Sequence, residues 1–388
     1  MGAVIELDDR LGAARAHARD WARDLRSTAL ELDRDPDTVY RCLDNPAVRH
    51  LSTMLIPAPW LPDRTLIGGY RFDGMTAMER VVFAEEIAAG DAGMMLASPG
   101  ASLSGVLVDL LADKEQKEWF YGRLLAAPTW TFFALTEPDH GSDAAAMGTR
   151  LDPDGEGGLL LRGAKRYIGN GARAQVGVVF ARDRPGPLGA TAVLVETGAP
   201  GFKAEPIPTI GLRGAQLSAI TLDGVPVPEG RVLGRHLSPT RRGVWSGVQM
   251  FNRLRPGVAA IALGIARSAH DYVTEQRGSL SKADRLRWER TGRRIDGVRQ
   301  LIWQAAAIVD AQPANGHLAS AAKARAARLA EEVTLEALEY FGPGARLTQP
   351  MLDKLIRDAR GVEFMEGTGN IQRLNTFQGL VQGKLDSD

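Results

Sequence analysis

One carboxylate near the end of the chain stands in an unusual setting. Glu366 follows the apolar pair Phe364 and Met365 in the segment FMEGTGNIQRL, residues 364–374. Apolar neighbours exclude water and raise the pKa of a carboxyl group, which suits a general base that must remove a weakly acidic proton. A surface glutamate near a helix start is the ordinary alternative, and Glu363, one turn earlier, is a rival carboxylate.

Two segments in the middle of the chain could present polar groups to a flat ligand. FFALTEPDHGSD, residues 132–143, leaves a strand-like run for a turn, and its Thr136, Ser142 and backbone amides could hydrogen-bond a ring edge. KRYIGNGARA, residues 165–174, places Tyr167 before a glycine-rich turn. Ordinary turns are the alternative for both segments, so neither is specific alone.

Arginines gather in residues 235–255 and 285–299. A solvated helix face with i, i+4 ion pairs is the default interpretation. Few acidic residues interleave, so phosphate binding or docking of an acidic carrier protein is the alternative. The six histidines show no metal-ligand spacing, and we propose no metal site.

The bulk composition is that of a globular protein. Of 388 residues, 44% are hydrophobic and 24% are charged, and 47 basic residues balance 47 acidic ones, so net charge favours neither nucleic acid nor membrane partners. Cys42 is the only cysteine, which excludes an internal disulfide. There is no secretory signal pattern and no apolar run of about 18 residues, so we expect a cytoplasmic protein.

The pattern of apolar residues changes twice along the chain. It is helical up to about residue 125, then becomes six to eight short β-branched or aromatic runs without intervening helices, and then returns to long helices. Three long helices are predicted at 255–277, 284–312 and 317–342, with a fourth from about Thr368. We therefore expect an α+β multidomain chain: an N-terminal α-helical domain (1–125), a middle antiparallel β domain (126–237) and a C-terminal four-helix bundle (238–388).

Taken together, these segments resemble the acyl-CoA dehydrogenase family over nearly the whole chain and in the same order. The segments at 132–143 and 165–174 are similar to the two flavin loops of that family. Three more segments are similar to family sequences: GLRGAQLSAITLDGVPVPEGRVLG (211–234), RPGVAAIALGIARSA (255–269) and QPMLDKLIRDARGVEFMEGTGNIQRL (349–374). Five collinear matches are far more specific than any one motif.

The resemblance implies FAD, a homo-oligomer (dimer or tetramer) that shares FAD sites, and α,β-dehydrogenation of an acyl thioester. In this family, a base removes the α-proton while hydride leaves the β-carbon for flavin N5. Glu366 matches the position of that base in the short- and medium-chain branches. The other family base position, before the bundle arginine Arg255, holds Leu254, which cannot titrate. The thioester carbonyl is expected at the Glu366 amide and a flavin hydroxyl.

Further site residues follow from the same resemblance. The cofactor-binding residues are expected to be Phe133, Leu135, Thr136, Ser142, Tyr167, Gly169, Arg277, Thr368 and Asn370. Arg277 matches an arginine that reaches the FAD of a neighbouring subunit. The substrate-binding residues are expected to be Ser142, Asn252, Arg253, Arg255 and Gly367.

Several positions depart from the family pattern. Gly169 stands where the family usually has a threonine that bonds flavin N5, Tyr167 replaces a tryptophan, and FGPG (341–344) replaces Gly-Gly-x-Gly. These departures look like the branch that oxidises acyl groups on acyl carrier proteins in polyketide-type pathways. The alternatives are therefore oxidation of a carrier-bound hydroxyacyl group toward a hydroxymalonyl-type extender unit, a non-catalytic flavin-fold binding protein, and an oxidase.

Overall fold

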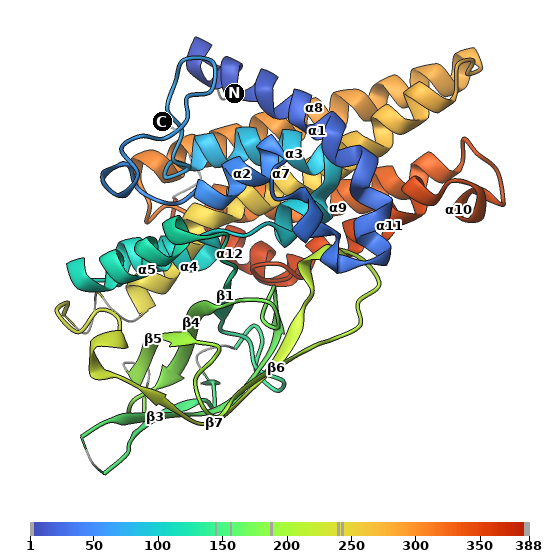
Figure 1. Ribbon diagram of the computed structural model, residues 1–388. Coiled ribbons are helices and arrows are strands. Elements are labelled where there is room, and N and C mark those ends of the chain that lie inside the picture. The colour runs from blue at the N-terminus through green and yellow to red at the C-terminus, as the bar shows by residue number, and fades with distance from the viewer. Residues whose placement is uncertain are drawn as a thin grey trace.

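The computed structural model describes residues 4–143, 146–155, 157–186, 189–238, 241 and 244–383. Helices lie above a curled sheet in Figure 1, and the chain passes from helices to strands and back to helices. The helices before the sheet are α1 (Asp9–Arg34), α2 (Pro46–Thr53), α3 (Ala77–Ala97), α4 (Ser102–Leu111) and α5 (Lys114–Ala126). Those after it are α7 (Val244–Gln276), α8 (Lys282–Ala311), α9 (His317–Leu338), α10 (Ala345–Thr348), α11 (Pro350–Val362) and α12 (Gly369–Val381).

Side-chain caps explain why several helices begin where they do. The Asp8 carboxylate accepts from the first turn of α1, and Thr76 does the same for α3. Asp113 and Gln116 form a reciprocal capping box at the start of α5. Each cap satisfies backbone N–H groups that have no partner inside the helix.

The sheet contains seven strands within the described residues. They are β1 (Thr131–Ala134), β2 (Arg150–Pro153), β3 (Leu159–Ile168), β4 (Val176–Arg182), β5 (Ala190–Glu196), β6 (Phe202–Pro206) and β7 (Ser218–Val227). The order is β1-β4-β2-β3-β7-β6, and β5 pairs with β4. Pairing is antiparallel except that β4 runs parallel to β1 and, at one residue pair, to β2. The predicted helix–sheet–helix fold class is confirmed.

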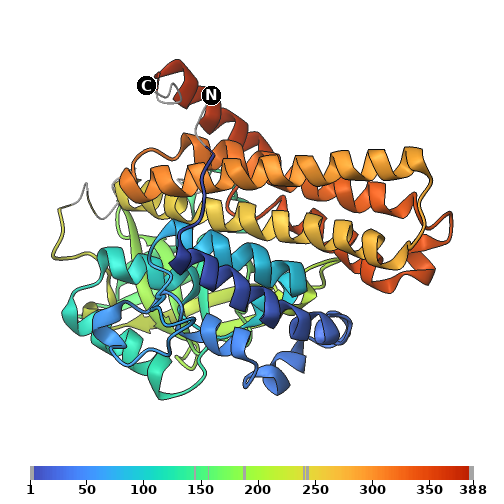
Figure 2. The same ribbon diagram turned by 90° about the horizontal axis from the view of Figure 1, so that it is seen from above.

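The long helices α7, α8 and α9 run side by side along the length of the molecule (Figure 2). Small side chains allow close approach, since Ala262 and Ala266 on α7 and Ala326 and Ala330 on α9 are fully buried. The expected fourth helix is present as α12, but α11, which packs on α7 and α9, was not predicted as a separate helix. No helix in the described ranges is long and apolar enough to cross a membrane.

A buried ion network joins the two helical parts of the chain. Lys354 Nζ on α11 donates to Asp91 Oδ1 on α3 (2.6 Å) and to Asp358 Oδ2 (2.5 Å). Asp91 interrupts α3 with non-helical backbone angles, and its carboxylate accepts from the N–H groups of Gly93 and Met94, so it caps the second half of the helix. The network therefore fixes both the break in α3 and the position of α11.

We expect Lys354→Met to be strongly destabilising. Without the ammonium group, Asp91 and Asp358 are two buried carboxylates with no cation between them, and loss of one partner of a buried pair costs about 3–5 kcal/mol. Urea unfolding followed by circular dichroism measures the change. Lys114→Met, which breaks the exposed pair with Glu118, is the control and should cost less than about 1 kcal/mol. Equal stability of the two variants would contradict the network's role.

Candidate functional site

Glu366 lies in a tight loop between α11 and α12. Side chains of α9 and α12 donate hydrogen bonds to the backbone of this loop. Lys323 Nζ, fully buried on α9, donates to the carbonyl oxygens of Glu363 (2.7 Å) and Gly367 (2.8 Å). The side chain of Gln372 donates to the Glu366 carbonyl oxygen (2.9 Å). Glu366 has a φ of 51°, a left-handed conformation that costs energy for a residue with a side chain. The loop is thus a strained arrangement that these hydrogen bonds from Lys323 and Gln372 maintain.

The second candidate carboxylate, that of Glu363, has a structural role. Glu363 Oε1 accepts from the N–H of Gly369 at 2.7 Å and so caps the start of α12. Glu366, in contrast, has a side-chain Oε2 that is shielded from solvent and has no hydrogen-bond partner, although the residue as a whole is half-buried. Of the two carboxylates, only Glu366 is available to a ligand.

Burial raises the pKa of Glu366 to about 7. The positive charges of Arg255, Lys323 and Arg80 act in the opposite direction but do not cancel the loss of water. A carboxyl group with this pKa is partly ionised at neutral pH and is more basic than an exposed glutamate. The Glu366 N–H has no hydrogen-bond partner among the described residues, so it can polarise a ligand carbonyl group beside the carboxylate.

The α7 side of the site presents Arg255. Asn252 donates from Nδ2 to the Pro313 carbonyl oxygen (3.1 Å), and its Oδ1 accepts from Arg255 Nη1 (3.0 Å). Both ends of this amide are therefore used inside the protein, so Asn252 orients Arg255 rather than reaching toward a ligand. Leu254, at the other family base position, is buried.

Arg80 on α3 is a site residue that sequence analysis missed. It is buried, and its Nη1 donates to the carbonyl oxygens of Gly74 (2.7 Å) and Met75 (2.8 Å). Its Nη2 donates to the carbonyl oxygen of Arg253, the half-buried neighbour of Arg255 on α7 (2.6 Å). The signal was present in the sequence, because Arg80 shares the apolar helix face of Ala77, Val81 and Ala84.

Aromatic contacts connect the first loop, residues 132–143, to the α7 side of the Glu366 site. The Phe133 ring of β1 meets the Phe251 ring of α7 edge-on with centroids 6.4 Å apart, and the Arg255 guanidinium lies 5.8 Å from the Phe251 centroid. The strand that leads into the loop at 132–143 therefore lies beside the part of α7 that carries Arg255.

Glu137, also missed from the sequence, fixes that loop. Its buried carboxylate accepts from the Gly148 N–H (2.6 Å), from the N–H and hydroxyl of Thr149 and from Lys165 Nζ (2.9 Å). Burial opposes ionisation, but these hydrogen bonds hold the pKa of Glu137 at about 2. The anchored carboxylate leaves the half-buried side chain of Thr136 at the loop surface.

The second loop combines strain with unused polar groups. Tyr167 and Asn170 have positive φ values of 62° and 57°, and the Tyr167 side chain is exposed. Asn170 Nδ2 donates to the Leu96 carbonyl oxygen of α3 (2.8 Å), while its Oδ1 is buried without a partner. A side chain at Gly169 would meet nothing closer than 4.0 Å. An exposed ring, an orphan acceptor and open space fit a flat, hydrogen-bonding cofactor such as a flavin.

The other predicted cofactor residues lie in three places. Leu135 and the exposed Ser142 are in the first loop. Thr368 precedes α12, and Asn370 in its first turn accepts from Arg373. Arg277 is exposed beyond the end of α7, 22 residues from Arg255 and thus about 33 Å along the helix axis. Arg277 is therefore not part of the Glu366 site of its own chain.

Three of the α8 arginines, Arg287, Arg294 and Arg299, form ion pairs within the chain. Arg287 contacts Glu336 and Glu339, and Arg294 contacts Glu332, all on or next to α9. Their acidic partners come from a neighbouring helix, so local spacing could not reveal them. In the segment 235–255, Arg242 lies outside the described residues.

A helix–sheet–helix subunit with a buried carboxyl group of raised pKa and two flavin-compatible loops is the arrangement expected of a flavin-dependent dehydrogenase. Two family models, "Acyl-CoA dehydrogenase, middle domain" and "Acyl-CoA dehydrogenase, C-terminal domain", match residues 132–225 and 241–380. An acyl-CoA dehydrogenase of Bacillus subtilis is 31% identical over 283 residues, which cover 70% of this chain and 73% of the relative. The chain belongs to the acyl-CoA dehydrogenase family.

Solved structures share this fold over the whole chain. Butyryl-CoA dehydrogenase from Megasphaera elsdenii superposes with a TM-score of 0.84 at 25% identity, covering 98% of this chain and 100% of that one. The prolyl acyl carrier protein oxidase AnaB gives 0.82 at 22% identity, covering 97% and 100%. FAD is the cofactor of this family, and flavin-dependent dehydrogenation of acyl thioesters is its general reaction.

We expect Lys323→Met to move the pH dependence of flavin reduction. If Glu366 is the base, the rate of reduction should rise with pH through a midpoint near 7, because only the ionised carboxylate can accept a proton. Removing one of the opposing positive charges should raise that midpoint by roughly one pH unit. Stopped-flow bleaching of the flavin by an acyl thioester at several pH values measures this. The exposed Lys282→Met variant is the control, and identical midpoints in all three proteins would contradict the assignment.

Proposed function

We propose that this protein dehydrogenates an acyl thioester and that Glu366 is the general base. One observation carries the proposal: the Glu366 carboxyl group is buried, lacks a partner and has its pKa raised to about 7. The two other candidate positions do not compete, because Glu363 caps α12 and Leu254 cannot ionise.

The geometry supports a division of labour within the loop. The carboxylate of Glu366 removes the α-proton, and its own N–H donates to the thioester carbonyl oxygen as negative charge develops there. The loops at 132–143 and 165–174 would hold FAD, which would supply the acceptor for the hydride of the β-carbon. Lys323 and Gln372 hold the backbone of the loop on which both groups lie. A strained residue with a buried, unpaired carboxyl group costs stability, which favours catalysis over a non-catalytic flavin-fold binding protein.

Glu366→Gln tests the proposed base. The amide cannot accept the proton, so we expect a rate of flavin bleaching at least about 1000-fold lower under anaerobic conditions, with FAD still bound. Glu363→Gln keeps an oxygen that can accept from Gly369 and should reduce flavin within about tenfold of the unmodified protein. Rapid bleaching by Glu366→Gln would place the base elsewhere.

A second candidate concerns the group that carries the acyl chain. The fold is shared with a prolyl acyl carrier protein oxidase and with butyryl-CoA dehydrogenase, so an acyl carrier protein and CoA are the two candidate carriers, with a carrier-bound hydroxyacyl group as an alternative substrate. The same acyl group offered on CoA and on a carrier protein separates these possibilities. Equal rates of flavin reduction would contradict specificity for a carrier protein, and formation of peroxide would identify an oxidase.

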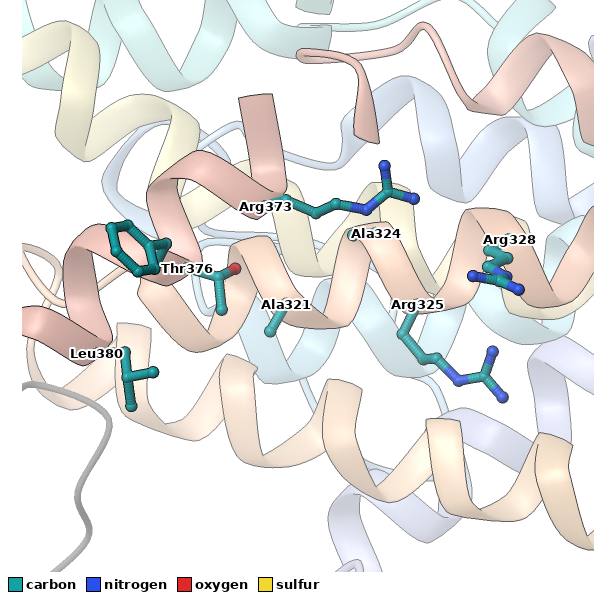
Figure 3. Close-up of a pocket in the computed structure, with 8 residues that line it drawn as sticks. Ala321, Ala324, Arg325, Arg328, Arg373, Thr376 and Leu380 are labelled. Atoms are coloured by element: carbon teal, nitrogen blue, oxygen red, sulfur yellow. The ribbon is translucent and has the colours of Figure 1, made fainter. Parts of the chain in front are cut away.

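We also propose that the protein is a homo-oligomer. Figure 3 shows Arg373, Thr376 and Leu380 of α12 facing α9 across a groove of about 460 Å³. On α12, Phe377, Leu380 and Val381 are 62%, 56% and 70% exposed, an apolar stripe larger than a lone subunit normally leaves to solvent. Arg277, remote from its own site, is then free to act on the FAD of a neighbouring subunit.

The double substitution Phe377→Glu and Leu380→Glu tests this surface. Two carboxylates on the apolar stripe should dissociate the oligomer because their burial at an interface would be costly. Size-exclusion chromatography with light scattering measures the mass. The control is Leu66→Glu, which introduces the same charge at another exposed leucine. An unchanged mass for the double variant would exclude the stripe from the interface.

A further inference from the structure

Thr136, in the first loop, has two hydrogen-bond donors that the protein does not use. Among the described residues, neither its backbone N–H nor its hydroxyl group has a partner. The residue is half-buried, so bulk solvent reaches these groups only in part. Polar groups in such a position normally have a partner, and here a bound ligand can supply it. Both donors of Thr136 are therefore available to an acceptor atom of a ligand.

Both peptide groups that flank Thr136 are held by β3. The Lys165 ammonium group donates to the Leu135 carbonyl oxygen (3.0 Å), and the Arg166 N–H donates to the Thr136 carbonyl oxygen (2.9 Å). In a planar trans peptide, the C=O and the following N–H point in opposite directions. Because the Leu135 carbonyl group faces Lys165, the Thr136 N–H faces away from it. The direction of this free N–H is thus set by a side chain of the strand that leads into the second loop.

The ammonium group of Lys165 is itself fixed in place. Its side chain is fully buried and pairs with the Glu137 carboxylate at 2.9 Å. Three further hydrogen bonds hold that carboxylate, so the ammonium group cannot move away without leaving a buried charge unpaired. A buried ion pair is weak evidence for a role in stability, since apolar residues of similar volume often stabilise a protein as well. Its specific effect here is to orient the Leu135–Thr136 peptide.

The orientation of this peptide matters for a ligand that gains electrons. An N–H group presents the positive end of the peptide dipole, whereas a carbonyl group presents the negative end. A flavin ring gains electron density on reduction, so a donor N–H stabilises its reduced form more than its oxidised form. Lys165 strengthens this donor, because a hydrogen bond to the carbonyl oxygen polarises the whole peptide group. A reversed peptide would have the opposite effect.

We propose that Lys165 is a positioning residue for the cofactor. It orients the Leu135–Thr136 peptide so that the Thr136 N–H donates to the flavin ring of FAD and favours the reduced form. This inference rests on the placement of FAD at the two loops in the proposed function. It does not depend on Glu366 being the base.

The midpoint potential of the bound FAD tests the proposal. Lys165→Met keeps the length of the side chain but cannot donate to the Leu135 carbonyl oxygen. We expect the preference of the protein for reduced over oxidised FAD to fall at least about tenfold, which lowers the potential of this two-electron couple by about 30 mV. Reductive titration of the FAD-loaded protein against a reference dye measures the potential. Lys203→Met, at an exposed position of β6 in the same sheet, is the control and should leave it unchanged. Equal weakening of both forms of FAD, with an unchanged potential, would overturn the inference.

A second measurement uses the unmodified protein and does not require Lys165→Met to fold. Isotopic labelling of threonine makes the Thr136 N–H visible by NMR, and Thr136→Ser identifies its signal. We expect the proton resonance to move downfield when FAD binds and further when the FAD is reduced, because a stronger hydrogen bond deshields the proton. A signal that neither step moves would overturn the inference. Neither measurement involves turnover, so failure of Glu366 as the base would leave both results interpretable.

Discussion

The site depends on one buried ammonium group that holds a loop in a conformation it would not otherwise keep. Lys323 donates to the carbonyl oxygens on both sides of Glu366, so the left-handed residue between them cannot relax. Burial lowers the pKa of Lys323 to about 8, so it remains largely protonated at neutral pH. The same charge limits how far burial can raise the pKa of Glu366. Lys323 therefore contributes both to the position of Glu366 and to the pKa of its carboxyl group.

Buried ionic contacts, as well as apolar packing, join the helices α3, α7 and α8. Glu85 and Glu86 on α3 accept from Arg267 of α7, and Glu85 also pairs with Arg299 of α8. These contacts tie the helix that carries Arg80 to the helix that carries Arg255. Since each partner is nearly desolvated, a shift of either helix would leave a buried charge unpaired. The spacing of the cations around Glu366 follows from this constraint.

The sequence alone was sufficient to predict the features that depend on residues close together in the chain. Helical and strand periodicity predicted the fold class, and the segment around Glu366 stood out because a carboxylate rarely follows two large apolar residues. What it could not supply were contacts between distant segments. Arg80 looked like one arginine of an amphipathic helix, and Lys323 lay within an alanine-rich run. The acids that pair with Arg287 and Arg294 of α8 lie on or next to α9, and α11 was hidden inside a segment that was recognised by its motif rather than by its helical spacing.

The break in α3 has a consequence for how the chain acquires its structure. Asp91 meets Lys354 across 263 residues of sequence, so a growing polypeptide exposes the acid long before its cation has been synthesised. Until then, the Asp91 carboxylate caps the second half of α3, but the Lys354 ammonium group that makes its burial favourable is absent. The N-terminal helices therefore stay partly hydrated until the C-terminal helices have been synthesised. The order of translation thus delays formation of the core that the two sets of helices share.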